Sequence, residues 1–251
     1  MGKETGLGDN FYIDGYDLSG DVGSISSAKG GNSPLTMTGI NKSAYERQGG
    51  QLTGELEWVS FFNTAAGAAH PALSTLPLTS RIASYFHAPA VGQIAASLQC
   101  KQVNYDPTRS DKGEITLKLH GENDQFPLEW GEQLTPGSTN IVGAGAQTSL
   151  DYGATGMPTA FGLQAYLQAF AFSGTSATVA IQHSNDNGGT DPWANIAGAV
   201  FTAVTATPGS QRIATAGNAS IKRWLRVNVT GTFSSFTFAV MAIRNMTAVA
   251  F

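Results

Sequence analysis

Apolar and polar residues alternate along several short stretches of the chain, and this pattern predicts β-strands. In residues 51–58, Leu52, Leu56 and Trp58 alternate with polar side chains, and residues 114–120 repeat the pattern. A period of two turns one face of a strand toward a core and the other toward water. We therefore expect two half-buried strands in these segments.

Other elements of the first half are predicted from turn residues and aromatic content. They are a strand or tight hairpin at 10–20 that turns at Asp14-Gly15, strands at 81–86 and 96–105, and one helical turn at 71–76. Residues 30–50 are long and rich in turn residues. They predict an extended loop with a role in partner contact.

The second half of the chain reads as strand almost throughout, with turns rich in Gly, Asn, Asp and Pro. The expected strands are 161–172, 175–183, 199–205, 220–229 and 232–243. Between 221 and 229 the odd-numbered residues, except Arg223, are apolar and should face the core. Trp224 and Arg226 should project from the opposite face.

Composition agrees with an all-β fold that has few short helical turns. The chain has 30 glycines, 13% charged residues and 41% hydrophobic residues, which favours turn-dense β structure. Residues 1–135 hold 9 basic and 15 acidic side chains, whereas residues 136–251 hold 5 and 3. We expect a first domain at 1–135, a Gly/Ser/Thr-rich linker at 136–148 and a jelly-roll-like β-sandwich at 149–251.

Neither the common catalytic motifs nor the common cofactor and metal motifs occur in the sequence. It contains no Gly-x-Ser-x-Gly, no phosphate-binding glycine loop, no His-Glu-x-x-His and no paired Cys-x-x-Cys. The single cysteine, Cys100, is expected to be a small buried residue. The histidines have no ligand spacing: they are His70, His87, His120 and His183. We therefore expect no enzyme activity, no cofactor and no metal.

Two groups of carboxylates have alternative interpretations. Asp14, Asp17 and Asp21 resemble a calcium loop that lacks its closing glutamate, and turn formation is the simpler interpretation. Four acidic residues on expected loops form a solvated face in the simpler interpretation, and two of them act as a glycosidase pair in the alternative. They are Glu122, Asp124, Glu129 and Glu132.

Neither a secretory signal nor a membrane span is predicted. The chain opens Met1-Gly2-Lys3-Glu4 without an apolar run, and no stretch approaches the roughly 18 apolar residues that a membrane span needs. We expect synthesis in a cytoplasm and no membrane insertion.

Taken together, many segments resemble the major tail proteins, or tail tube proteins, of long-tailed, non-contractile bacteriophages. The segments that carry the resemblance are 11–19, 23–25, 34–44, 70–74, 97–106, 128–131 and 134–137, and in the second half 211–215 and 223–227. They are distributed along the chain, so that the resemblance extends over nearly its whole length, and they are structural rather than catalytic signatures.

The resemblance implies a structural virion protein that assembles into stacked rings, generally of six copies. Domain 1–135 would be a tube domain, a β-sandwich or barrel whose sheet continues into its neighbours, and domain 149–251 a decoration domain on the exterior. The implied partners are copies of the chain, the tail terminator, tape measure and tail-tip proteins, and DNA that passes through the lumen without specific binding. The implied location is the phage tail, after synthesis in the host cytoplasm.

Three sets of residues are candidates for these roles. Glu55, Glu57 and Glu114 are candidates for the lumen, because carboxylates repel the phosphates of passing DNA. Leu35, Ile40 and Tyr45 are candidate apolar anchors for an adjacent ring, and Trp193 and Trp224 are candidate contacts for host surface glycans. An outer solvated face is the alternative for the glutamates, and a core or rim position is the alternative for Trp193.

Two other functions compete with the tail tube. A free carbohydrate- or receptor-binding β-sandwich protein of the tail tip would need a preformed ligand site and a discrete oligomer. A glycan hydrolase would need two facing carboxylates in a cleft and has the least support.

Overall fold

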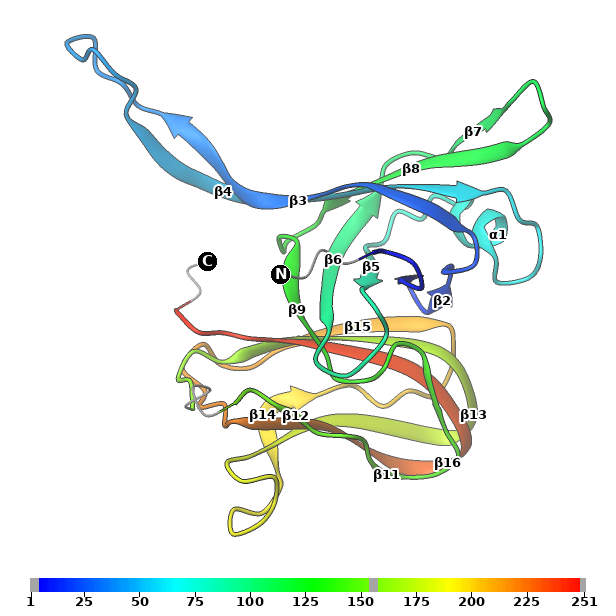
Figure 1. The fold of residues 1–251 in the computed structure, drawn as a ribbon, viewed down its shortest axis with the longest axis vertical. Helices are drawn as coiled ribbons and strands as arrows, with labels where there is room; N and C mark the ends of the chain where they lie inside the picture. The colour runs from blue at the N-terminus through cyan, green and yellow to red at the C-terminus, as the bar shows by residue number, and fades with distance from the viewer. Residues whose placement is uncertain (1–4, 154–157, 249–251) are drawn as a thin grey trace. The chain divides into compact units, whose positions relative to one another are not determined.

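The computed structural model describes residues 5–153 and 158–248, and in these residues the fold is all-β with one short helix (Figure 1). The chain divides into two compact units that interleave in sequence. Unit 1 comprises the described parts of 1–20, 84–97 and 130–251, and unit 2 comprises 21–83 and 98–129. The predicted fold class is therefore confirmed.

The strands of unit 1 include the two longest of the fold. They are β1 (Asn10–Ile13), β2 (Tyr16–Asp17), β9 (Glu129–Gln133), β10 (Thr139–Ile141), β11 (Gly145–Ala146), β12 (Leu150–Asp151), β13 (Leu163–Ser184), β14 (Ala194–Val200), β15 (Gly209–Ala214) and β16 (Trp224–Arg244). Unit 2 contains β3 (Val22–Thr36), β4 (Arg47–Phe61), α1 (Ala69–Leu73), β7 (Asp106–Arg109) and β8 (Ile115–Asn123). Three strands contribute residues to both units: β9, whose first residue belongs to unit 2, β5 (Arg81–Phe86) and β6 (Ile94–Gln102).

In unit 1 the hydrogen-bonded strand order is β14-β13-β16-β9-β6-β5-β1-β2. Strands β10, β11 and β12 also pair with β16, and β15 also pairs with β13. The hairpin expected at 10–20 is confirmed, because Ile13 pairs with Tyr16. Its turn residues Asp14 and Gly15 have φ of 52° and 79°, the left-handed conformation that tight hairpins require.

Strands β13 and β16 form one long antiparallel ribbon that runs through both layers of the sandwich (Figure 1). The ribbon has register shifts between Ala169 and Ser176, where each strand bends. A Cβ on Gly231 would lie 2.2 Å from the carbonyl oxygen of Ser176, so only glycine fits this close approach. The sequence predicts separate strands here, whereas the glycines bend the two strands without ending them.

The core of unit 1 lies between the two halves of this ribbon. Leu225, Val227 and Val229 are fully buried, which confirms the prediction that the odd-numbered apolar residues of 221–229 face the core. Phe236 and Phe238 are also fully buried, and their rings stack with centroids 4.7 Å apart. The packing of these apolar side chains is the main stabilising term of the unit.

Unit 2 is built around the sheet β3-β4-β8-β7, with β6 also paired to β8. Its core includes Leu56 and Trp58 from β4 and Leu117 and Leu119 from β8, all fully buried. These strands confirm the two alternating segments, although β4 is longer than expected. Cys100 is buried in β6, as predicted.

Two predictions for unit 2 need correction. The helix begins at Ala69 rather than at Pro71, and the Asp21 carboxylate accepts a hydrogen bond from the Ala69 backbone N–H at 2.9 Å. Residues 30–50 are mostly strand and not an extended loop, because β3 continues to Thr36 and β4 begins at Arg47. Both faces of this hairpin are exposed, so the sequence carries no alternation to mark it.

In unit 1 the segment expected to be a linker, 136–148, contains two short paired strands. Its strands β10 and β11 bond to β16, because main-chain pairing does not require the large apolar residues that this segment lacks. The strand expected at 199–205 lies earlier, as β14, and the short strands β7, β12 and β15 were not predicted. Strands of two to six residues are too short to show a period.

Candidate assembly surfaces

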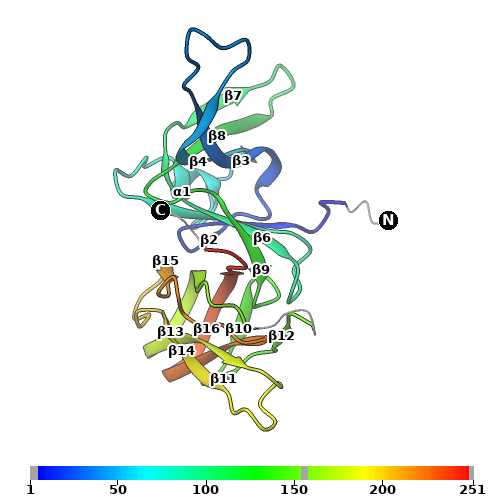
Figure 2. The same ribbon diagram turned by 90° about the vertical axis from the view of Figure 1, so that its left-hand side faces the viewer.

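A long hairpin extends from the body of unit 2 and ends in an apolar tip (Figures 1 and 2). We call residues 31–49 the arm. Residues 31–37 and 39–49 are all exposed, so neither face of the hairpin is packed against the described protein. A two-stranded hairpin in water is marginally stable by itself, and this arm therefore gains little from the monomer.

The tip of the arm is ordered by polar contacts and by the Arg47 guanidinium, which lies 5.6 Å from the centroid of the Tyr45 ring, and its apolar side chains stay exposed. The backbone N–H of Met37 bonds to the Glu46 carbonyl at 2.9 Å, and the Lys42 ammonium pairs with the Glu46 carboxylate at 2.9 Å. The large hydrophobic side chains are exposed: Leu35 52%, Met37 62%, Tyr45 77% and Ile40 fully. The three predicted anchors, Leu35, Ile40 and Tyr45, therefore lie on one exposed element.

The two edges of the unit 2 sheet differ. In the described residues β3 pairs only with β4, so one side of this 15-residue strand offers backbone groups without a strand partner. At the other edge, β7 has only four residues and contains Pro107, which has no N–H to donate. Short, proline-bearing edges resist further pairing, whereas a long edge is a template for it.

Glu55 and Glu57 lie on the outward polar face of β4, opposite the buried Leu56 and Trp58. The Glu55 carboxylate accepts hydrogen bonds from the Lys29 ammonium at 2.5 Å and from the Ser27 hydroxyl at 3.2 Å. The Lys29 hydrogen bond, opposed by partial desolvation, lowers the pKa of Glu55. Glu55 is therefore ionised at neutral pH, and its charge is largely balanced by Lys29.

Glu114 does not lie on this face. It is exposed in the turn between β7 and β8, where the Ser110 backbone N–H bonds to the Glu114 carbonyl at 2.8 Å. The outward face carries other charges on neighbouring strands, from Glu122 and Lys118 on β8. The structure therefore brings together two of the three predicted glutamates, within a face of mixed charge.

In unit 1, Trp193 and Trp224 flank an arginine. Trp224 and Arg226 are two residues apart on β16 and share its outward face, as expected. The Arg226 guanidinium carbon lies 4.3 Å from the centroid of the Trp193 ring, within the range of a cation–π contact. The sequence predicts the direction of Arg226 but not this stacking, because Trp193 is 33 positions away.

The loop between β13 and β14 that carries Trp193 is held by two carboxylates, and that of Asp191 accepts a hydrogen bond from the Asn185 backbone N–H at 2.8 Å. Asp186 accepts hydrogen bonds from the Thr190 hydroxyl at 2.6 Å and from backbone N–H groups, including that of Gly189 at 3.0 Å. The Thr190 hydroxyl, with the backbone donors, holds the pKa of Asp186 well below its usual range. This loop is therefore a rigid support for Trp193.

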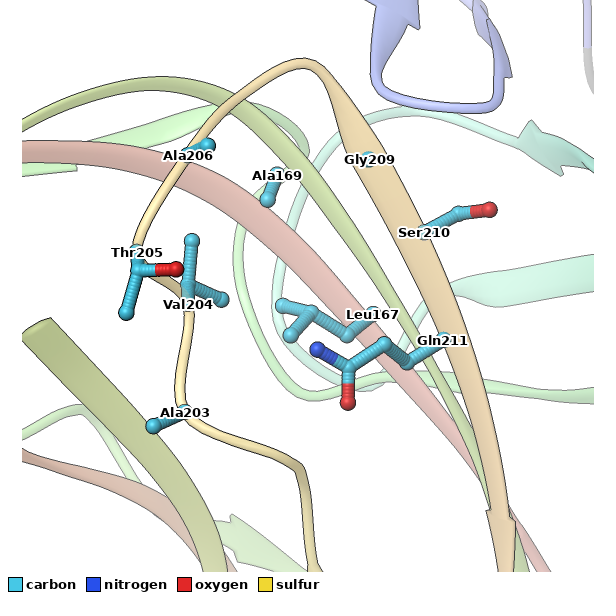
Figure 3. Close-up of a pocket in the computed structure, with 9 residues that line it drawn as sticks. All are labelled: Leu167, Ala169, Ala203, Val204, Thr205, Ala206, Gly209, Ser210 and Gln211. Carbon is cyan, nitrogen blue, oxygen red and sulfur yellow. The ribbon is translucent and has the colours of Figure 1, made fainter.

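A small pocket of about 180 Å³ lies between β13, β15 and the segment that precedes β15 (Figure 3). Leu167 and Gln211 point into it, and the Gln211 amide donates to the Thr202 carbonyl at 3.0 Å. Ser210 points away and bonds to Asp14 at 2.8 Å. No charged side chain lines the pocket, which therefore offers space for an apolar group but no chemistry.

The acidic residues with alternative interpretations have separate local partners. Asp17 accepts hydrogen bonds from Ser19, Asp14 from Ser210 and Asp21 from Asn63. Within residues 5–153 and 158–248 there is no group of three or more His, Cys, Asp or Glu that could hold a metal ion. None of the helices described there is long and apolar enough to cross a membrane.

The chain matches no family model and no curated protein. Among solved structures it is similar to the Dit protein of SPP1, described as a paradigm of the hub adsorption apparatus in phages that infect Gram-positive bacteria. That match has 11% identity and a TM-score of 0.31, and covers 94% of this chain and 99% of the other. Chains of the phage p2 baseplate in its activated conformation with Sr and with Ca match at 9% and 10% identity, with TM-scores of 0.33 and 0.32. They cover 94% and 95% of this chain, and 98% and 99% of their own length.

Proposed function

We propose that this chain is a structural protein of a bacteriophage tail that assembles with copies of itself into the stacked rings of a tail tube. The observation that carries the proposal is the arm, whose paired strands are exposed on both faces and end in unpacked Leu35, Ile40 and Tyr45. Such a surface is costly in water and is explained by a partner that covers it. The resemblance of the sequence to major tail proteins supports another copy of the chain as that partner.

Ring closure would use the open edge of β3. Pairing this edge with a strand of a neighbouring copy satisfies a row of backbone groups, and repetition around an axis closes a ring. The short β7 edge with Pro107 discourages main-chain pairing, so the β3 edge of one copy would meet a different surface of the next copy, the head-to-tail contact that a ring needs. We propose six copies per ring, the number that the resemblance implies.

Stacking would use the arm, which reaches an adjacent ring and buries Leu35, Ile40 and Tyr45 there. The β-sandwich formed by residues 149–251 would decorate the exterior of the tube. Further partners would be the tail terminator, tape measure and tail-tip proteins. The protein would be made in the host cytoplasm and function in the virion.

The outward face of β4 and β8, with Glu55 and Glu57, is the proposed lining of the lumen. Its carboxylates and lysines partly balance one another, and such a surface lets DNA slide without the strong binding that a basic lining would give. Glu114, in its exposed turn, would stand at the rim of this face.

We predict that replacing both Glu55 and Glu57 with lysine preserves assembly and creates DNA binding. When chains assemble beside linear duplex DNA at low salt, this variant should retain the DNA in a gel-shift assay and release it as salt rises. The matched control is Asp17→Lys with Asp111→Lys, which makes the same change of charge at two exposed positions outside the arm and the β4 face. Equal DNA retention by the control would show that the β4 face does not line the channel.

Sedimentation velocity of the purified chain over a concentration series tests the assembly itself. We expect a shift from the monomer toward large species as concentration rises, because each copy adds the same edge and arm. A single monomer boundary at every concentration would contradict the proposed function.

A further inference from the structure

Arg226 combines partial burial with a charge that no neighbouring carboxylate balances. Its Nε donates a hydrogen bond to the Gln182 Oε1 at 2.9 Å, and its guanidinium lies over the Trp193 ring. In the described chain no Asp or Glu forms an ion pair with it. Burial lowers the pKa of Arg226, yet arginine stays charged at any physiological pH. The Nη groups are therefore charged donors without a bound acceptor.

The neighbouring cations on the same segment are neutralised. The Lys222 ammonium lies 2.8 Å from the Asp191 carboxylate, and Arg223 makes a two-pronged contact with Asp151 at 2.6 and 2.7 Å. Every acidic residue after position 135 lies either in these pairs or, as Asp186, in the hydrogen bonds of its own loop. Arg226 therefore differs from its neighbours in being available to an external anion.

The residues around Arg226 form an ordered polar row. Gln182 on β13 pairs in register with Arg226 on β16 and with Asn195 on β14. The Gln182 amide donates to the Asn195 Oδ1 at 3.0 Å while its own oxygen accepts from Arg226. The row therefore crosses three adjacent strands, which Figure 2 shows side by side, and its geometry is fixed before any ligand arrives.

Two tryptophans lie near the row in register. Trp193 stacks on the Arg226 guanidinium, and Trp224 is the next outward residue on β16, with the Arg223 guanidinium carbon 5.4 Å from its ring centroid. Aromatic surface beside planar hydrogen-bonding groups is suited to a ring that has apolar C–H faces and polar edges. A guanidinium fork recognises a carboxylate or phosphate group.

We propose that this surface, the Arg226 patch (Gln182, Trp193, Asn195, Trp224 and Arg226), binds an anionic carbohydrate through its carboxylate or phosphate groups. The anion pairs with the Arg226 Nη atoms, the hydroxyl groups bond to the amide row, and the rings contact tryptophan. The binding goes beyond the proposed tube assembly and does not depend on it, since all five residues lie in unit 1 of a single chain.

The test is biolayer interferometry of the full chain on three immobilised polysaccharides: polygalacturonate, phosphomannan and neutral dextran. We expect binding to one or both anionic polysaccharides, weaker at high salt, and none to dextran. Polygalacturonate alone would assign carboxylate recognition, and phosphomannan alone would assign phosphate recognition. Binding to neither anionic polymer, or equal binding to dextran, would overturn the proposal.

Variants locate the binding on the patch. Arg226→Gln should weaken the affinity for the anionic polymer about tenfold or more, since a charge-assisted contact is lost. The affinity of Arg226→Lys should lie between those of the unmodified chain and Arg226→Gln, because lysine keeps the charge but not the planar fork. Asn195→Ala, at an exposed position, should weaken it a few-fold without disturbing folding. The control Arg109→Gln removes an exposed positive charge from unit 2 and should leave affinity unchanged. An equal loss in the control, or no loss in Arg226→Gln and Asn195→Ala, would overturn the assignment.

Discussion

Replacing Ile40 and Tyr45 with aspartate is expected to abolish self-association while leaving the chain folded. Both side chains are exposed in the monomer, so the change removes no core contact. In an assembly they would be buried anchors, and losing such an anchor typically costs about 2 kcal/mol or more, roughly thirtyfold in concentration for each residue. Sedimentation velocity should show monomer at concentrations where the unmodified chain forms large species.

The matched control for this prediction lies on the same tip. Asn41→Asp with Ser43→Asp adds the same two charges at exposed positions but removes no apolar side chain. We expect assembly to survive in this control. If both variants lose assembly equally, added charge and not apolar contact is the cause, and if neither loses it, the arm is not an interface.

The largest effect on folding stability is expected from Phe236→Ala. The Phe236 ring is fully buried, stacks on Phe238 and meets Phe172 edge to face with centroids 5.8 Å apart. Removing a buried phenylalanine leaves a cavity and typically costs about 3–5 kcal/mol in the free energy of unfolding. Urea denaturation followed by far-UV circular dichroism should show the main transition of unit 1 at lower urea.

Phe61→Ala is the control for this prediction, because Phe61 is 51% exposed and lies in unit 2. We expect its effect on the free energy of unfolding to stay below about 1 kcal/mol. A Phe236→Ala variant as stable as this control would contradict the packing described for the sandwich.

The sequence predicts strands best where one face is buried. Leu225, Val227 and Val229 alternate with half-buried partners, and their burial was predicted correctly from period alone. The arm shows the opposite case, since both of its faces meet water and no alternation exists. Its Gly, Ser and Pro residues favour a loop, and only the pairing of β3 with β4 makes it a strand.

Glycine residues are the second reason why some strand ends were predicted wrongly. A local reading ends a strand at Gly174 or Gly231, whereas in the structure these residues let a continuous ribbon bend from one layer to the other. The pairing of 139–141 and 145–146 with β16 depends on contacts nearly a hundred positions away. Such pairing leaves no mark in the short segment itself.

The candidate sites were predictable only in part. The exposure of Leu35, Ile40 and Tyr45 could be predicted, because these apolar residues lie in a turn-rich segment. Their position on a paired hairpin could not be predicted. The Arg226 patch depends on registers between three strands and on a ring stacked from a loop. The sequence contained two signals of the patch: the outward direction of Arg226, and Trp193 and Trp224 as candidate glycan contacts.

Negative-stain electron microscopy of the purified chain over a concentration series tests the proposed tail tube most directly. The proposal predicts hollow tubes of constant diameter, or stacked rings, that lengthen as concentration rises and are absent when Ile40 and Tyr45 are aspartate. Discrete particles or single rings that never stack would contradict the tube, and would favour a free carbohydrate- or receptor-binding protein of the tail tip.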